Sequence, residues 1–313
     1  MMASVVEIKD LVKRYKELTA VDGLSLSIEE GEIFGLLGPN GSGKTTTISC
    51  LLSLLDFNEG EITVFGEEMT PDNYSVKSRI GVIMQNVAVA DELTVYENID
   101  MFCGMYIKDK ATRRQYVEQA IDFAGLRDYV KFRPKKLSGG LLRRLNIACG
   151  IAHKPKLIIL DEPTVAVDPQ SRNHILEGIE QLNREGATII YTTHYMEEVE
   201  QICSRIAIID HGKLIATGTK EELIAMIDHT ETITAEVRDF DEALIDEIKA
   251  LPHVIEAKLE EGKLTVSYSG GKHNLVRLVG LLNDRSVHLG RVYSELPTLN
   301  DVFLDITGRT LRD

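Results

Sequence analysis

The sequence predicts an α/β protein: a sheet of buried parallel strands covered by helices, followed by a smaller α+β module. Short apolar runs recur between stretches of helical spacing, at 33–37, 80–84, 156–160, 187–191 and 205–210. Such runs are typical of strands that are buried on both faces of a parallel sheet. Beyond residue 230, alternating and helical spacings follow one another in a different order, which predicts a separate small domain.

The most informative stretch lies between the first apolar run and a helical pattern at 45–55. It fits the phosphate-loop pattern G-x-x-x-x-G-K-[ST], with the residues Gly38, Pro39, Asn40, Gly41, Ser42, Gly43, Lys44 and Thr45. In such a loop, backbone N–H groups and a helix N-terminus bind a polyphosphate. Lys44 would reach the β- and γ-phosphates, Thr45 would ligate Mg²⁺ and Thr46 would contact the α-phosphate. The alternative is a Gly-rich turn that carries a lysine by chance.

Composition and charge narrow the classes of function. The 313 residues are 43% hydrophobic and 27% charged, as in ordinary globular proteins. The net charge of −14 argues against binding of nucleic acid through a basic surface. The sequence contains no run of about 18 apolar residues, so it predicts no membrane span. The first residues lack the features of a signal peptide. We expect the scattered cysteines to be free, buried thiols: Cys50, Cys103, Cys149 and Cys203.

Two alternating runs before the phosphate loop, 6–11 and 24–28, predict an antiparallel edge. Tyr15 lies between them, either as a half-exposed residue at a strand end or as a ring that stacks on adenine. After the loop, 58–66 predicts a turn and a strand. Residues 94–152 are predicted to be mostly helical, with helices near 94–107 and 112–125. A third helix is predicted to begin after 137–140, with Ser138 as its N-cap.

Polar residues follow three of the predicted central strands. Gln85 follows 80–84, Asp161 and Glu162 follow 156–160, and His194 follows 187–191. Open α/β sheets bind ligands at the carboxyl ends of their strands, so these side chains are candidates for one site. Taken singly, each has a simpler interpretation: solvated carboxylates after a strand, or a structural histidine.

Taken together, the motifs resemble those of the nucleotide-binding subunit of ABC transporters, over roughly residues 4–225. In the family's order they are the phosphate loop, Gln85, the signature segment Leu137-Ser138-Gly139-Gly140-Leu141, Asp161-Glu162, Val167-Asp168-Pro169 and His194. The resemblance implies a P-loop NTPase domain at 1–229 with a mixed sheet core and an antiparallel β edge. It also implies a helical subdomain at about 86–152.

The resemblance also implies roles in ATP hydrolysis. Glu162 would be the general base for the attacking water, and His194 would hydrogen-bond the γ-phosphate. Gln85 would contact Mg²⁺ or the water, and Asp161 would bind Mg²⁺ through a water molecule. Tyr15 would stack on adenine. ATP and Mg²⁺ are therefore the expected cofactors.

In this family two subunits enclose two ATP molecules, which implies a dimer of this chain. Ser138, Gly139 and Gly140 would contact the ATP of the other subunit, and Asp168 would couple the two sites. We favour a homodimer over a heterodimer. A groove near 87–93 would receive a helix of a membrane-spanning permease, which would place the chain at the cytoplasmic face of the membrane. Two departures, Leu141 for the usual Gln and Ala166-Val167 for Gly-Leu, put turnover rate and dimer tightness in question.

Residues 230–313 predict the order β-α-β-β-α-β, a ferredoxin-like accessory domain. The tail at 296–308 resembles the ATPases of the exporter (ABC-2-like) branch, which export drugs, antibiotics, lipids or sodium. We expect this domain to stabilise a dimer, because it carries no metal or nucleotide motif; a regulatory ligand site is the alternative. Two other functions are open: a soluble ABC protein of translation or DNA repair, and a non-catalytic regulator.

Overall fold

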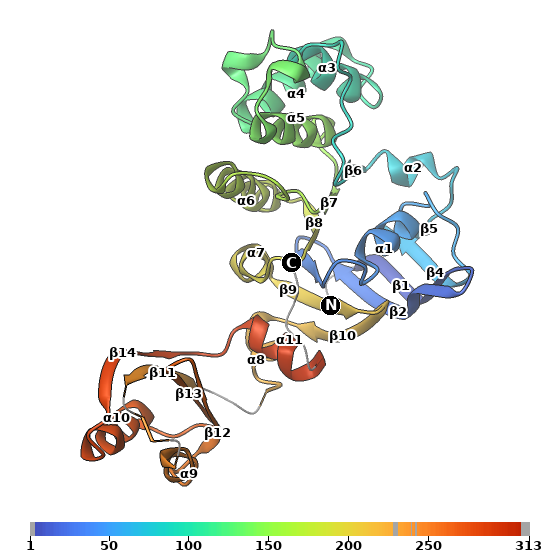
Figure 1. Ribbon diagram of the computed structural model, residues 1–313. Coiled ribbons are helices and arrows are strands. Elements are labelled where there is room, and N and C mark those ends of the chain that lie inside the picture. The colour runs from blue at the N-terminus through green and yellow to red at the C-terminus, as the bar shows by residue number, and fades with distance from the viewer. Residues whose placement is uncertain (1–3, 228–230, 239, 242, 308–313) are drawn as a thin grey trace. The chain divides into compact units, whose positions relative to one another are not determined.

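The computed structural model describes residues 4–227, 231–238, 240–241 and 243–307 (Figure 1). Contacts divide the chain into a first unit that ends at Lys220 and a second that begins at Glu221. The predicted boundary at 229/230 falls on residues 228–230, outside the described residues, and stays a prediction. Within the described ranges, no helix is long and apolar enough to cross a membrane.

The first unit is built on a six-stranded sheet with the order β10-β9-β3-β8-β7-β6. Its strands are β3 (Ile33–Leu37), β6 (Ile80–Ile83), β7 (Leu157–Asp161), β8 (Thr188–Thr193), β9 (Arg205–Asp210) and β10 (Lys213–Gly218). Only β10 runs antiparallel to its neighbour, so the predicted mixed sheet is confirmed. Every residue of β3, β7 and β8 is buried. The carboxyl ends of β3, β8, β7 and β6 therefore lie along one edge.

A four-stranded antiparallel sheet, β2-β1-β4-β5, forms the predicted edge. Its strands are β1 (Ser4–Tyr15), β2 (Leu18–Glu29), β4 (Glu59–Val64) and β5 (Glu67–Glu68). Helix α1 (Lys44–Leu51) is shorter than predicted, because Ser53 has a φ of 51° and cannot continue a helix. The sequence analysis missed α2 (Tyr74–Lys77), a single turn that Asn73 caps.

Three helices between β6 and β7 lie together (Figure 1), and their buried side chains form a hydrophobic cluster of their own. They are α3 (Val95–Gly104), α4 (Lys110–Phe123) and α5 (Gly139–Ile151), joined by the 3-10 turns η1 (Arg127–Tyr129) and η2 (Pro134–Lys136). Thr94 and Glu97 form a capping box at the start of α3. Ser138 caps α5, because its Oγ accepts from Leu141 N at 3.3 Å, as predicted. Further along the chain come α6 (Pro169–Arg184), α7 (Met196–Ile202) and α8 (Lys220–Ile224).

His153, just beyond α5, gives these helices a pH-dependent contribution to stability. Its ring is buried and stacks on Tyr106 with 4.0 Å between ring centroids, and its Nε2 lies 3.2 Å from Ile80 O. Burial lowers the pKa of His153, because the charged ring loses its hydration, and the hydrogen bond with Ile80 O opposes this shift only in part.

We expect the free energy of unfolding to fall as pH drops below about 6.5, the value for an unfolded histidine. Above that pH the imidazole is neutral in both states and contributes no pH dependence. Below it, the unfolded chain takes up a proton that the folded chain resists. Urea unfolding of the wild type and of His153→Gln at several pH values checks this. The stability of the wild type relative to His153→Gln should fall as pH drops, because only the wild type carries the titrating ring; a difference that does not change with pH would contradict the assignment.

The second unit contains the predicted β-α-β-β-α-β order, followed by one more helix. Its strands form an antiparallel sheet with the order β12-β13-β11-β14, and α9 and α10 pack against one face through a common hydrophobic cluster. The elements are β11 (Glu231–Arg238), α9 (Leu244–Lys249), β12 (Val254–Glu260), β13 (Lys263–Tyr268), α10 (Asn274–Asp284), β14 (His288–Glu295) and α11 (Leu299–Thr307).

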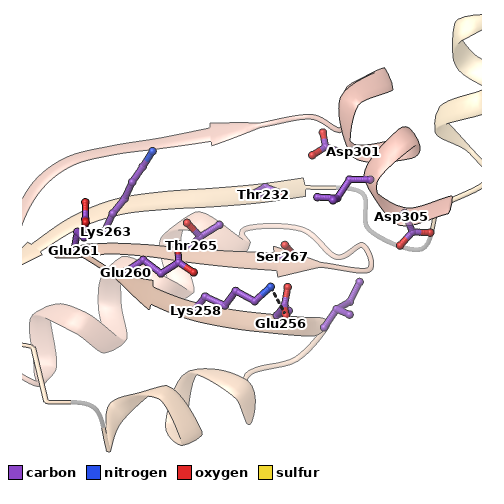
Figure 2. A pocket seen from close by; sticks show the side chains of 12 residues that line it. Thr232, Glu256, Lys258, Glu260, Glu261, Lys263, Thr265, Ser267, Asp301 and Asp305 are labelled. Carbon is purple, nitrogen blue, oxygen red and sulfur yellow. Dashed lines mark ion pairs between the residues drawn. The ribbon is translucent and has the colours of Figure 1, made fainter. Parts of the chain in front are cut away.

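The other face of this sheet borders an open hollow of about 1400 Å³ (Figure 2). Side chains of β12 and β13 line it, together with Asp301 and Asp305 of α11. Glu256 and Lys258 form an ion pair of 2.8 Å on its floor. None of the lining side chains is buried, so the hollow presents a mixed-charge surface to solvent.

Candidate active site

The phosphate loop connects β3 to α1, and its shape requires glycine at two points. Gly43 has a φ of 106°, and a Cβ atom there would lie 2.5 Å from Ala20 O. A Cβ atom on Gly38 would lie 2.2 Å from Ile209 O. Both contacts are far below van der Waals distance, so any other residue would force the backbone to move. The Oγ atom of Ser42 is buried inside this loop without a hydrogen-bond partner among the described residues, which fits a site for an added acceptor such as phosphate.

Lys44 is buried at the first turn of α1, with 4% of its surface exposed. Its Nζ donates to Gly38 O at 2.8 Å and to Pro39 O at 3.1 Å, and lies 3.3 Å from Glu162 Oε1. Burial lowers the pKa of Lys44, and the Glu162 carboxylate opposes that shift. The ammonium group of Lys44 is therefore held by carbonyl groups of the phosphate loop, next to the Glu162 carboxylate.

The Glu162 carboxylate lies next to the two other side chains that follow predicted strands, Gln85 and His194. Gln85 Nε2 donates to its Oε2 at 3.4 Å, and His194 Nδ1 lies 3.4 Å from its Oε1. With Lys44, three side chains from separate elements surround this one carboxylate. Glu162 also has a φ of 47°, in the left-handed region that residues with a Cβ atom seldom adopt. The sheet topology brings Gln85, Glu162 and His194 together, as the sequence analysis expected of residues that follow strands, and Lys44 lies next to them from the start of α1.

Asp161, the last residue of β7, lies beside the hydroxyl of Thr45. Thr45 Oγ1 donates to Asp161 Oδ2 at 2.9 Å, and Thr192 Oγ1 donates to Asp161 Oδ1 at 2.6 Å. A carboxylate and a hydroxyl at the phosphate loop are the oxygen ligands that Mg²⁺ prefers. The residues present thus fit a magnesium site that would be completed by phosphate and water.

The signature segment and Asp168 lie elsewhere, at the adjoining N-termini of α5 and α6. Asp168 caps α6, because its Oδ1 accepts from Ser171 N at 2.9 Å. A Cβ atom on Gly140 would lie 2.3 Å from Ser171 Oγ and 3.1 Å from Asp168 Oδ2. Within the described part of the chain, residues 138–140 form no hydrogen bond or ion pair with the phosphate loop. Ala166 has a φ of 59°, a conformation that glycine adopts more easily.

Tyr15 ends β1 with 42% of its surface exposed. Lys13 Nζ lies 4.9 Å from the centroid of its ring and donates to Asp56 O at 2.5 Å. The structure leaves the ring accessible, as stacking on a base would require.

Two buried charged residues near the site were missed by the sequence analysis. Glu198 of α7 accepts hydrogen bonds from Thr164, Tyr191 and Thr193, at 2.7, 2.8 and 2.8 Å. Arg143 of α5 is buried among backbone carbonyls. The sequence offers only a weak signal for either, a charged residue within a helix whose partners come from distant segments.

Comparison with known proteins agrees with the fold. Residues 21–165 match the family described as ABC transporter. The chain is 40% identical over 312 residues to the linearmycin resistance ATP-binding protein LnrL of Bacillus subtilis, covering 99% of this chain and 100% of that protein. It is 35% identical over 314 residues to the Nod factor export ATP-binding protein I of Ralstonia nicotianae, covering 99% and 95%.

Among solved structures, the chain is similar to a dimeric, post-hydrolysis state of the ATP-binding cassette MJ0796 bound to ADP and Pi. The TM-score is 0.63 at 26% identity, over 68% of this chain and 98% of that one. The fold, the phosphate loop and these similarities define an ATP-binding cassette. The chain belongs to the ABC transporter family, as an ATP-binding and ATP-hydrolysing subunit of its exporter branch.

Proposed function

We propose that two copies of this chain enclose two ATP molecules and drive export of a substrate through a separate membrane-spanning permease. The observation that carries the proposal is the convergence of Lys44, Gln85 and His194 on the Glu162 carboxylate, beside the phosphate loop. Phosphoryl transfer to water requires positioned phosphates, neutralised charge and an oriented water molecule, and these residues can supply each of them.

The proposal gives each of these residues a role. The backbone N–H groups of 38–45, the Ser42 hydroxyl and the Lys44 ammonium group bind the β- and γ-phosphates. Glu162 accepts the proton of the attacking water, and Gln85 and His194 orient that water and the γ-phosphate. Thr46 contacts the α-phosphate, and the exposed ring of Tyr15 stacks on adenine.

Thr45, Gln85 and, through water, Asp161 would hold Mg²⁺. When bound, the ion supplies positive charge to the phosphate oxygens. The chain's own contribution is the hydrogen bond between Thr45 Oγ1 and Asp161 Oδ2, which holds the hydroxyl and the carboxylate next to each other.

A dimer would account for the signature segment, which lies at a helix N-terminus and, within the described residues, forms no hydrogen bond or ion pair with its own phosphate loop. Ser138, Gly139 and Gly140 would contact the γ-phosphate of ATP in the other subunit, where a helix N-terminus favours an anion. Asp168 Oδ2 would lie 3.1 Å from a Cβ atom on Gly140, so it is close to the signature segment and would couple the two sites. Because one chain carries one complete set of motifs, we favour a homodimer over a heterodimer.

The permease contact would involve the loop at 87–93 and the helical subdomain, which would place the chain at the cytoplasmic face of the membrane. Large apolar side chains are exposed there, as expected for a surface with a partner: Val87, Met101, Met105, Tyr106 and Phe132. Relatives are named for linearmycin resistance and Nod factor export, which supports export without selecting a cargo.

The test is affinity capture of Glu162→Gln from detergent-solubilised native membranes, with and without ATP, followed by mass spectrometry. We expect ATP-dependent recovery of a protein with several membrane spans. Lys44→Ala is the matched control and should lose the ATP dependence. Recovery of ribosomal or DNA-repair proteins, without a membrane protein, would overturn the proposal.

A further inference from the structure

A buried guanidinium group lies against the backbone of the catalytic loops. Arg143 belongs to α5, and 4% of its surface is exposed. Its Nε donates to Pro163 O at 2.6 Å, and its Nη2 donates to Glu162 O at 2.5 Å. Its Nη1 donates to Met84 O at 3.0 Å and to Gln85 O at 2.8 Å. One side chain of α5 therefore binds four carbonyl groups of two loops.

Only arginine can make this set of contacts. Its guanidinium group carries five N–H donors in a rigid plane, whereas lysine carries three donors on one atom. A buried cation is costly unless hydrogen bonds replace its hydration, and here carbonyl oxygens do so. Among the described residues, Arg143 forms no ion pair within 4.0 Å, so these carbonyl groups are its main support. Burial lowers the pKa of Arg143, as this environment requires.

The hydrogen bond that Arg143 donates to Glu162 O supports an unfavourable backbone conformation at Glu162. Glu162 has a φ of 47° without being glycine. Its N–H donates to Thr192 O at 3.1 Å and to Thr192 Oγ1 at 3.0 Å, while its carbonyl accepts from Arg143. Strained residues persist where the surroundings hold them from several sides. Glu162 is held by β8 at one end and by α5 at the other.

We propose that Arg143 is a positioning residue that holds Gln85 and Glu162 in their catalytic arrangement and links it to α5. The signature segment lies at the N-terminus of the same helix, one turn before Arg143. A displacement of α5 at the signature segment would thus move the donors that fix the general base. This inference rests on the proposed role of Glu162 and adds to it a route by which nucleotide in the partner's site regulates this one.

The test is the rate of ATP hydrolysis by the full chain carrying Arg143→Lys. The variant keeps the charge and loses the planar set of donors. We expect kcat to fall about 10- to 100-fold, because small displacements of catalytic groups have effects of that size. The affinity for ATP should be unchanged, since Arg143 does not contact the phosphate loop. The matched control is Arg144→Lys on the same helix, whose Nη1 donates to Ala124 O, away from the site.

A second measurement separates positioning from a general loss of stability. The rate should be expressed as kcat per nucleotide-binding site. If Arg143 had only a structural role, its replacement would lower the number of binding-competent sites and leave this kcat unchanged. In addition, Arg143→Lys should have little further effect in a Glu162→Gln background, because the group it positions is already gone. Equal effects in both backgrounds, or an equal effect of Arg144→Lys, would overturn the inference.

A neutral variant keeps the test decisive if Arg143→Lys does not fold. Arg143→Gln leaves no buried charge and can donate to one or two of the four carbonyl groups, so the same comparisons apply to it. A slow Glu162→Gln with a normal Arg143→Gln would contradict the Arg143 inference alone. A normal Glu162→Gln would contradict the assignment of the general base, and with it this inference.

Discussion

Replacing Glu162 with glutamine is expected to lower kcat for ATP hydrolysis by about 10²- to 10⁴-fold, the range for removal of a general base. The amide has the size of the carboxylate and can still contact Gln85, so binding of ATP should persist. A carboxamide cannot accept the proton of the attacking water. The variant should therefore accumulate as an ATP-bound dimer. Phosphate release and sedimentation with ATP and Mg²⁺ measure the two effects.

The matched control for this prediction is Glu197→Gln. Glu197 is exposed in the first turn of α7, so Glu197→Gln makes the same change of charge on a solvent-exposed side chain. Its kcat should equal that of the wild type. A Glu162→Gln protein that hydrolyses ATP as fast as this control would refute the role of Glu162. One that stays monomeric with saturating ATP would count against the two-ATP dimer.

The residues that carry the chemistry could be predicted because they follow strands with a clear apolar pattern. Once 80–84, 156–160 and 187–191 are interpreted as parallel strands, their carboxyl ends must lie together, and Gln85, Glu162 and His194 lie there with them. The phosphate loop could be predicted from its sequence motif. The motif is recognisable because close backbone contacts require glycine at fixed positions of the loop. Local pattern and sheet topology determine both.

The buried residues that hold the site in place could not be predicted in this way. Arg143 and Glu198 are charged residues within helices, where a sequence pattern suggests an exposed face. Their partners are backbone carbonyls and hydroxyl groups that no motif identifies, and that come close only when α5 and α7 pack on the sheet. The early end of α1 was missed because Ser53, an ordinary residue, adopts a left-handed conformation. Such choices depend on tertiary packing.

Replacing Lys44 with alanine should have the second large effect, on both activity and stability. The side chain supplies the positive charge next to the β- and γ-phosphates, and Glu162 lies 3.3 Å from it. We expect hydrolysis to be abolished and ATP binding to be greatly weakened. Removing one partner of a buried ion pair leaves an uncompensated charge, which costs about 3–5 kcal/mol. Thermal unfolding without nucleotide should therefore show a lower midpoint for Lys44→Ala.

A double variant distinguishes the loss of the ion pair from the loss of packing. Glu162→Gln removes the carboxylate that Lys44→Ala leaves behind, so the combined protein should regain part of the stability that Lys44→Ala loses, while remaining inactive. Urea unfolding of the wild type, the two single variants and the double variant gives the interaction free energy. If the two losses simply add, Lys44 and Glu162 do not interact in the folded protein, and the site as described here is wrong. A favourable interaction free energy would confirm that Lys44 and Glu162 stabilise each other in the nucleotide-free protein, as the distance of 3.3 Å between them predicts.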